Sequence, residues 1–224
     1  MGALTLVIGN KNYSSWSLRP WLLLRHMGVA FTEIRIPLDL PDTKARLKPL
    51  SPTGKVPVLH DGELVVWDTL AICEYVSEQY LNGKGWPEAA AARAQARSLA
   101  AEMHSGFQGL RSAWPMNTRL RRKLLPDAAV SRDIERVSDL WTQCLEKSGG
   151  PWLFGEFTVV DAMFAPVALR FYSYQPILPS RAAAYVQTHL NNPALKEWMA
   201  AGAAETEVIK DDEVGYLLGE PGWK

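Results

Sequence analysis

The segment Val56-Pro57-Val58-Leu59 places a proline at the head of an apolar run that otherwise has the composition of a β-strand. Proline cannot donate a hydrogen bond to a neighbouring strand, so within a sheet it must lie at an edge or carry a special bond geometry. A second apolar run, Leu64-Val65-Val66, follows, and the intervening Asp61-Gly62 predicts a β-hairpin. We therefore expect a hairpin whose first strand begins with a cis proline.

The segments around this hairpin predict the rest of a small α/β domain. Residues 4–8 and 31–36 are expected to be strands, 16–27 and 68–80 helices, and 43–48 a short helix. Pro20 is acceptable only in the first turn of its helix, so that helix should begin near Ser15 to Ser17, with a serine as N-cap. The order β-α-β-(α)-β-β-α describes a thioredoxin-like domain over residues 1–80.

Beyond this domain the composition changes. Residues 81–88 are rich in glycine and end near a proline, which predicts a linker, and residues 89–224 are expected to form an all-α helical bundle. Helices are predicted over 88–111, 127–147, 162–171, 185–190 and 193–202, the third preceded by a capping box at Thr158 and Asp161. The basic run 119–123 is interpreted as a solvated helix end, the tail 205–224 as irregular, and His26, His60 and His189 as surface or turn residues.

The composition argues against several classes of function. Lys plus Arg and Asp plus Glu both number 24, so the chain has no overall electrostatic reason to bind nucleic acid or an anionic membrane. No apolar stretch approaches the ~18 residues of a membrane span, and no signal peptide is recognisable at the start. Cys73 and Cys144 form neither a C-x-x-C pair nor a metal-binding cluster, which predicts two reduced thiols in a cytoplasmic protein without a metal.

A row of hydroxyls occupies the loop between the first predicted strand and the first helix. In open α/β folds ligands bind at the carboxyl ends of strands, and this loop carries Ser14, Ser15 and Ser17. Thioredoxins have Cys-x-x-Cys at this position, so disulfide exchange by the chain's own thiols is disfavoured. One interpretation is that the serines only cap the helix. The other is that a hydroxyl beside the positive helix end stabilises a bound thiolate.

Two further features are expected on the same rim of the domain. Val56-Pro57 would present a free backbone amide and carbonyl to an extended peptide. Asp68-Thr69 begins a helix, where a carboxylate, a hydroxyl and backbone amides can hold the ammonium and carboxylate of an amino acid. The alternative interpretation is that Asp68 only caps this helix. Taken together, the features describe a site for a short peptide thiol.

The chain resembles the glutathione transferase superfamily over essentially its whole length. The resemblance is carried by four segments in order: 14–19, 54–59, 68–75 and 154–161. It implies a cytoplasmic homodimeric detoxification enzyme of the serine type that uses glutathione as co-substrate. It also implies that Ser14 or Ser15 donates to the glutathione sulfur, and that the glutathione site is formed by Trp16, Lys55, Val56, Pro57, Asp68 and Thr69.

The serine loop looks most like that of the zeta class, with departures. Trp16 stands where that class has cysteine, which argues against its maleylacetoacetate isomerase activity. Asp68-Thr69 replaces the usual Glu/Gln-Ser pair, so the carboxylate reaches less far if glutamate is the reference. The resemblance does not decide which serine donates to the sulfur. The zeta pattern favours Ser14, whereas the spacing to Arg19 in related serine classes favours Ser15. Arg19 itself is interpreted as a structural brace.

The electrophile is expected between this rim and the helical domain. His104, Phe107 and Arg111 lie at helical or near-helical spacing on the first predicted helix of the bundle, where they would form the acceptor pocket. Packing of Phe107 in the bundle core is the alternative. The leading hypothesis is a transferase that adds the glutathione thiolate to a small electrophile; the alternatives are a glutathione-dependent cis–trans isomerase and a non-catalytic binding protein of the same fold.

Overall fold

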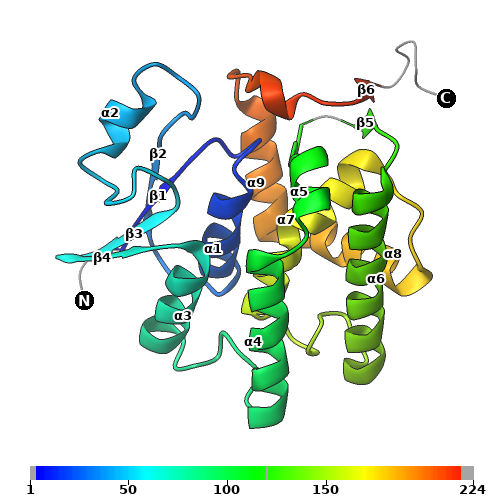
Figure 1. Cartoon of the computed structure of the whole chain (residues 1–224). Helices are drawn as coiled ribbons and strands as arrows, with labels where there is room; N and C mark the ends of the chain where they lie inside the picture. The colour runs from blue at the N-terminus through cyan, green and yellow to red at the C-terminus, as the bar shows by residue number, and fades with distance from the viewer. Residues whose placement is uncertain (1–3, 120, 218–224) are drawn as a thin grey trace.

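The computed structural model describes residues 4–119 and 121–217. Its N-terminal part contains, in chain order, β1 (Thr5–Ile8), α1 (Ser15–His26), β2 (Thr32–Arg35), α2 (Thr43–Leu47), β3 (Val58–Asp61), β4 (Leu64–Trp67) and α3 (Thr69–Tyr80). This is the predicted order, including the short α2 and the hairpin. In Figure 1 these elements form the blue to cyan side of the molecule.

The four strands form one sheet in the order β2-β1-β3-β4, in which β1 runs parallel to β2 and antiparallel to β3. Side chains alternate between its faces, as the period of a strand requires. Leu6 and Ile8 pack with α1 and α3, whereas Val7 and Val58 pack with Leu47 of α2 on the opposite face. The expected thioredoxin-like α/β fold is therefore confirmed.

The rest of the described chain is mainly helical. It contains α4 (Ala90–Ser105), α5 (Gln108–Ala113), α6 (Ala128–Ser148), α7 (Val159–Tyr174), α8 (Ser180–Asn191) and α9 (Pro193–Ala204), a 3-10 turn η1 (Lys210–Asp212), and the paired short strands β5 (Arg122–Lys123) and β6 (Tyr216–Leu217). Helix α7 is buried along nearly its whole length and contacts α1, α4 and α8. It joins the two parts of the molecule, with α9 beside α1 (Figure 1).

Side-chain caps set the starts of α6 and α7. Asp127 accepts hydrogen bonds from the amides of Ala129 and Val130 at 2.8 Å each and so begins α6. Thr158 and Asp161 form the predicted capping box of α7. Because these bonds satisfy amides that have no partner within the helix, the starts of α6 and α7 could be predicted from their first residues. The helix predicted over 185–190 begins earlier, at Ser180, where no side chain caps it.

The predicted continuous helix over 88–111 is wrong. Gly106 leaves the helical conformation and Phe107 adopts a left-handed one, with φ 57°, so that α4 ends and α5 begins after a break. A Cβ atom on Gly106 would lie 2.7 Å from the carbonyl oxygen of Glu102, which only glycine avoids. The alanine-rich composition of α4 outweighed this single glycine in the prediction.

Three other expectations need correction. The basic run is not a helix end: Arg122 is buried in β5 and forms an ion pair with Glu213, which lies 91 positions along the chain. His189, expected at the surface or in a turn, is fully buried. The tail is only partly irregular, because residues 210–212 form η1 and 216–217 form β6; its remainder, 218–224, lies outside the described residues.

Candidate functional site

A cavity of about 500 Å³ opens where the starts of α1 and α3 meet the end of α4. It is lined by the six residues expected to bind glutathione, which are Trp16, Lys55, Val56, Pro57, Asp68 and Thr69. Two residues of the expected acceptor pocket, His104 and Arg111, also line it. The remaining lining residues were not predicted: Thr53, Trp67, Ser105 and Gln108. Ser14, Ser15 and Phe107 are not part of this lining. Residues from both parts of the chain therefore line the same cavity.

The two serines at the start of α1 are in different situations. Ser14 is the N-cap; its Oγ donates to the Oγ of Ser17 over 2.8 Å and accepts from the Ser17 amide over 3.4 Å. The Ser17 Oγ also accepts from the Gly9 amide over 3.1 Å. Ser15 is half-buried, and its hydroxyl makes no hydrogen bond within the described residues. The Ser14 hydroxyl therefore caps the helix, whereas the Ser15 hydroxyl is unengaged.

The indole of Trp16 contacts two guanidinium groups. The Cζ atoms of Arg19 and Arg111 lie 4.3 and 4.8 Å from its ring centroid, within the range of cation–π attraction. Arg19 is fully buried and donates from Nε to the carbonyl of Met163 on α7 over 2.9 Å. Burial lowers the pKa of its guanidinium, and the nearby Arg170 and Arg111 lower it further. Arg19 thus braces α1 against α7 and contributes positive charge beneath Trp16.

The Val56–Pro57 peptide bond is cis, as predicted. The preceding residue, Lys55, is held by Ser51, whose Oγ accepts from the Lys55 amide over 3.1 Å and donates to its carbonyl over 2.7 Å. Val56 lies outside the ladders of β3, and its amide and carbonyl make no hydrogen bond in the described part of the chain. An extended peptide can therefore pair with the backbone at Val56.

Asp68 has a left-handed backbone, with φ 72°. For a residue other than glycine such a conformation costs about 1–3 kcal/mol and is concentrated at functional sites. Its Oδ1 accepts from the Leu70 amide over 2.8 Å and thereby caps α3, while its Oδ2 lies 2.7 Å from Nε2 of His104. The carboxylate therefore links the start of α3 to the end of α4 across the cavity.

Thr69 donates a hydrogen bond to the Trp16 carbonyl, which Pro20 leaves without a partner in the helix. In an α-helix the Trp16 carbonyl would accept from the amide of residue 20, which proline lacks. Pro20 lies in the second turn of α1, not in the first as expected, and the buried Thr69 hydroxyl supplies the donor to the Trp16 carbonyl over 2.9 Å. The Thr69 amide, at the first position of α3, has no intrahelical acceptor and is available to an anion.

The break between α4 and α5 determines which side chains reach the cavity. Arg111 donates from Nη1 to the carbonyls of His104 and Gly106, over 3.2 and 3.0 Å, and burial lowers the pKa of its guanidinium. Phe107 is buried instead and packs edge-on against Phe164, with centroids 6.4 Å apart. The break therefore directs Arg111 toward the ligand site and Phe107 into the core.

The loop before α1 is held by residues that the sequence did not indicate. The Glu205 carboxylate accepts from the amide of Lys11 over 2.7 Å and from that of Asn12 over 3.1 Å. The side chain of Glu205 is only 6% exposed. Its partner Lys11 lies 194 positions away, and no local pattern links two such distant segments.

Tyr13, one residue before the serines, is fixed in the same way. Its hydroxyl donates to Oε1 of Glu213 over 2.5 Å and accepts from Nη2 of Arg119 over 2.8 Å. Burial, together with the Glu213 carboxylate, raises the pKa of Tyr13. The segment after α9 thus clamps the serine loop from outside the thioredoxin-like domain.

In residues 4–119 and 121–217, no group of three or more His, Cys, Asp or Glu side chains is placed to hold a metal ion. None of the helices in these same ranges is long and apolar enough to cross a membrane. Cys73 is fully buried, and burial raises the pKa of its thiol.

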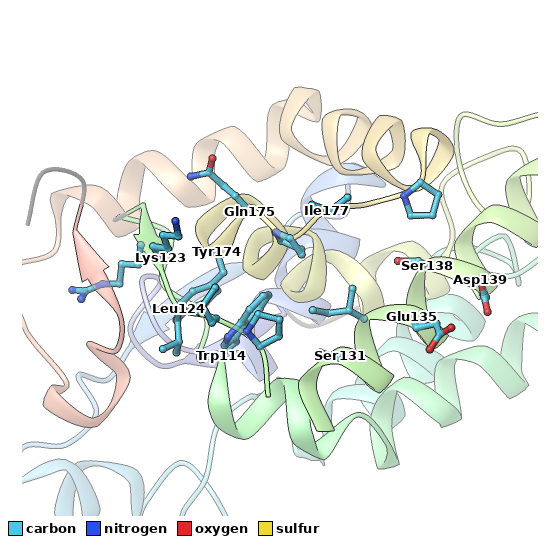
Figure 2. Close-up of a pocket in the computed structure, with 16 residues that line it drawn as sticks. Trp114, Lys123, Leu124, Ser131, Glu135, Ser138, Asp139, Tyr174, Gln175 and Ile177 are labelled. Atoms are coloured by element: carbon cyan, nitrogen blue, oxygen red, sulfur yellow. The ribbon is translucent and has the colours of Figure 1, made fainter. Parts of the chain in front are cut away.

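A second, larger cavity of about 870 Å³ lies in the helical part. Figure 2 shows Trp114 and Tyr174 toward one end of it and Glu135 and Asp139 along α6 at the other. Its lining contains no residue of the thioredoxin-like part. The 500 Å³ cavity is therefore the stronger candidate, because it lies where ligands bind in open α/β folds.

Comparison with known families decides the identity. A model described as glutathione S-transferase, N-terminal domain, matches residues 13–79, and one described as glutathione S-transferase, C-terminal domain, matches residues 127–201. Together they cover more than half of the chain. The chain belongs to the glutathione S-transferase superfamily.

Solved glutathione transferases have the same fold. The theta class glutathione S-transferase of Xanthomonas axonopodis pv. citri, solved with glutathione bound, is 26% identical, with a TM-score of 0.62 over 89% of this chain and 98% of that chain. A glutathione transferase homologue from Burkholderia with bound glutathione is 21% identical, with a TM-score of 0.69 over the same shares of the two chains. Dichloromethane dehalogenase of Methylorubrum extorquens is 36% identical over 53 residues, a match that spans 24% of this chain and 18% of that protein.

Proposed function

We propose that this member of the superfamily is an enzyme that binds glutathione in the 500 Å³ cavity and adds its thiolate to a small electrophile. One observation carries the proposal: the cavity brings together the cis-Pro57 segment, the starts of α1 and α3, and His104 and Arg111 of the helical part. The similar transferases solved with bound glutathione support it. Residues 1–80 would hold glutathione, residues 89–224 would hold the electrophile, and residues 81–88 would link the two domains.

The groups of the cavity match those of glutathione. The free amide and carbonyl of Val56 would pair with the backbone of the cysteinyl residue. The Asp68 carboxylate would hold the γ-glutamyl ammonium, and the Thr69 amide at the positive end of α3 would hold the neighbouring carboxylate. Lys55, a cation without a carboxylate partner in the described part of the chain, would bind the glycine carboxylate.

The start of α1 would then lower the pKa of the thiol. A free thiol has a pKa of about 8.5, which falls when the thiolate accepts a hydrogen bond near a helix N-terminus. A hydroxyl of Ser14 or Ser15 would donate that bond. The thiol proton passes to solvent, and the sulfur forms a bond with the electrophilic carbon as its leaving group departs with the electron pair.

The unengaged hydroxyl of Ser15 supports this residue as the donor, since Ser14 would have to turn its hydroxyl away from Ser17. The zeta-type pattern supports Ser14 instead. Trp16 in place of the zeta-class cysteine speaks against the isomerase alternative. A non-catalytic protein would bind glutathione without ionising it.

We propose in addition a cytoplasmic homodimer. A groove of about 620 Å³ runs between α4 and α6, and Leu64 and Trp67 of the edge strand β4 are 46% and 49% exposed. Docking of the thioredoxin-like domain of one subunit on the helices of the other would cover both surfaces. Cys73 and Cys144 are free thiols, in keeping with a reducing compartment.

Calorimetric titration with glutathione between pH 6 and 9, in two buffers of different ionisation enthalpy, tests the proposal. We expect the wild type to bind and release a proton, and either Ser14→Ala or Ser15→Ala to bind without releasing it. Loss of one donor to a reacting anion costs about 2.7–4 kcal/mol, so that variant should also lose conjugation rate by about 100- to 1000-fold.

Ser112→Ala is the matched control, because Ser112 is exposed on α5 and makes no hydrogen bond from its side chain to the described residues. Absence of glutathione binding at every pH would contradict the proposal. Binding without proton release by the wild type would instead support the non-catalytic alternative.

A further inference from the structure

The charges that line the 500 Å³ cavity do not balance. Its ionisable residues are Lys55, Asp68, His104 and Arg111. Asp68 is already bonded to the α3 amides and to His104, whereas neither Lys55 nor Arg111 forms an ion pair with a carboxylate of the described residues. The cavity therefore carries an excess of positive charge that an anionic ligand would neutralise.

Arg111 is placed to act on such a ligand. Its Nη1 is anchored on two backbone carbonyls, while its Nε and Nη2 make no hydrogen bond within the described part of the chain. The guanidinium rests against the Trp16 indole, 4.8 Å from the centroid, and the side chain lines the cavity. A planar cation held by one nitrogen, with a second edge unengaged, presents paired donors that match a carboxylate.

Two more arginines increase the positive potential behind Trp16. Arg19 is completely buried, and its Nη1 and Nη2 have no partner among the described residues. Arg170 is also buried, and its partners among the described residues are backbone carbonyls, those of Trp114 over 2.7 Å and Pro166 over 3.3 Å. Because buried cations without a carboxylate are costly, their presence beside the cavity favours an anion there.

Glutathione has no carboxylate left for Arg111. If it binds as proposed, its glycine carboxylate uses Lys55 and its γ-glutamyl carboxylate uses the start of α3. Arg111 then stays unpaired, on the side of the cavity formed by α5. We propose that Arg111 binds a carboxylate of the second substrate, so that the electrophile is a small organic acid. This inference rests on the proposed transfer function.

A pair of acceptors that differ in one charge tests the inference. With 4-chloro-3-nitrobenzoate, the thiolate sulfur bonds to the ring carbon that bears chlorine, chloride leaves with the electron pair, and the thiol proton goes to solvent. Methyl 4-chloro-3-nitrobenzoate undergoes the same substitution without the negative charge. Each kcat/KM is divided by the uncatalysed rate with glutathione, and the acid-to-ester ratio is the measured quantity.

We expect the wild type to prefer the acid, and Arg111→Gln to lower the acid-to-ester ratio roughly 10- to 100-fold, the loss of a charged hydrogen-bond pair. Arg111→Lys keeps the charge but loses the paired donors, so it should retain only part of the preference. Arg132→Gln removes an equal charge from an exposed position on α6 and should leave the ratio unchanged.

The outcomes separate the inference from the function on which it rests. If the wild type turns over both acceptors with a ratio near one, or if Arg111→Gln leaves the ratio as it was, the transfer function stands and the role of Arg111 is overturned. If calorimetry shows no glutathione binding, both are overturned. A ratio that is lost in Arg111→Gln, kept in part in Arg111→Lys and unchanged in Arg132→Gln supports the role of Arg111.

Discussion

Replacing Thr69 by valine isolates one hydrogen bond between the two helices that flank the cavity. The Thr69 hydroxyl donates to the Trp16 carbonyl over 2.9 Å, and that carbonyl has no intrahelical donor because residue 20 is proline. Valine has nearly the shape of threonine, so Thr69→Val removes the donor and leaves the packing largely intact. The Trp16 carbonyl is then left unsatisfied.

The size of the effect follows from burial. A buried polar group that loses its partner costs about 1–3 kcal/mol. Thr69 is only 1% exposed, but Trp16 is half-buried, so water has partial access to the freed carbonyl. We therefore expect Thr69→Val to lower the free energy of unfolding by about 1–2 kcal/mol, the lower half of that range.

A double-mutant cycle with Pro20→Ala provides the decisive measurement. Alanine restores an amide at position 20, which gives the Trp16 carbonyl an intrahelical partner, so Thr69→Val should cost much less in that background. Urea unfolding followed by tryptophan fluorescence on the four proteins gives a coupling energy, which we expect to be about 1 kcal/mol. Thr188→Val is the matched control, because the Thr188 hydroxyl donates to the Ala184 carbonyl within an uninterrupted helix.

Equal destabilisation by Thr69→Val in both backgrounds would refute the assignment of the hydroxyl to the carbonyl that Pro20 leaves free. A cost as small as that of Thr188→Val would refute it as well.

Two further predictions concern other parts of the chain. Burial lowers the pKa of His189 to about 3, while an unfolded histidine has a pKa of about 6.5, so the unfolded state binds the proton first and stability falls below pH 6.5, by about 2 kcal/mol at pH 5. Urea unfolding at pH 5 and 7.5 should show a smaller loss for His189→Phe, and an equal loss would contradict the prediction. Glu205→Gln weakens the bonds to the Lys11 and Asn12 amides, so their hydrogen exchange should speed up and glutathione affinity should fall several-fold; unchanged exchange would argue against the clamp.

Features that depend on neighbouring residues were predictable from the sequence. The hairpin at Asp61-Gly62, the Asp127 cap and the capping box of α7 each arise from groups within a few positions of one another. Their order along the chain was sufficient for the fold, and it placed Val56 and Asp68 on the rim of one cavity.

Features that depend on distant partners, or that oppose the helix propensity of their surroundings, were not predictable. The break at Gly106 opposes the helix propensity of its surroundings, and it decides that Arg111, not Phe107, lines the cavity. The basic run was misread because the partner of Arg122 is Glu213, which no local pattern identifies. The burial of His189 was not predicted because a polar side chain on a helix gives no sign that Trp152, from outside that helix, packs against it.

The clamp on the serine loop has a consequence for synthesis. Lys11 leaves the ribosome 194 residues before its partner Glu205, and Tyr13 leaves it 200 residues before its partner Glu213. A nascent chain that has reached residue 80 contains every strand of the sheet and all three of its helices, yet lacks the carboxylates that hold the loop. Domains usually fold in the order in which they are made. Here the ligand loop of the earlier domain acquires its final hydrogen bonds only after the helices of the later domain have been made.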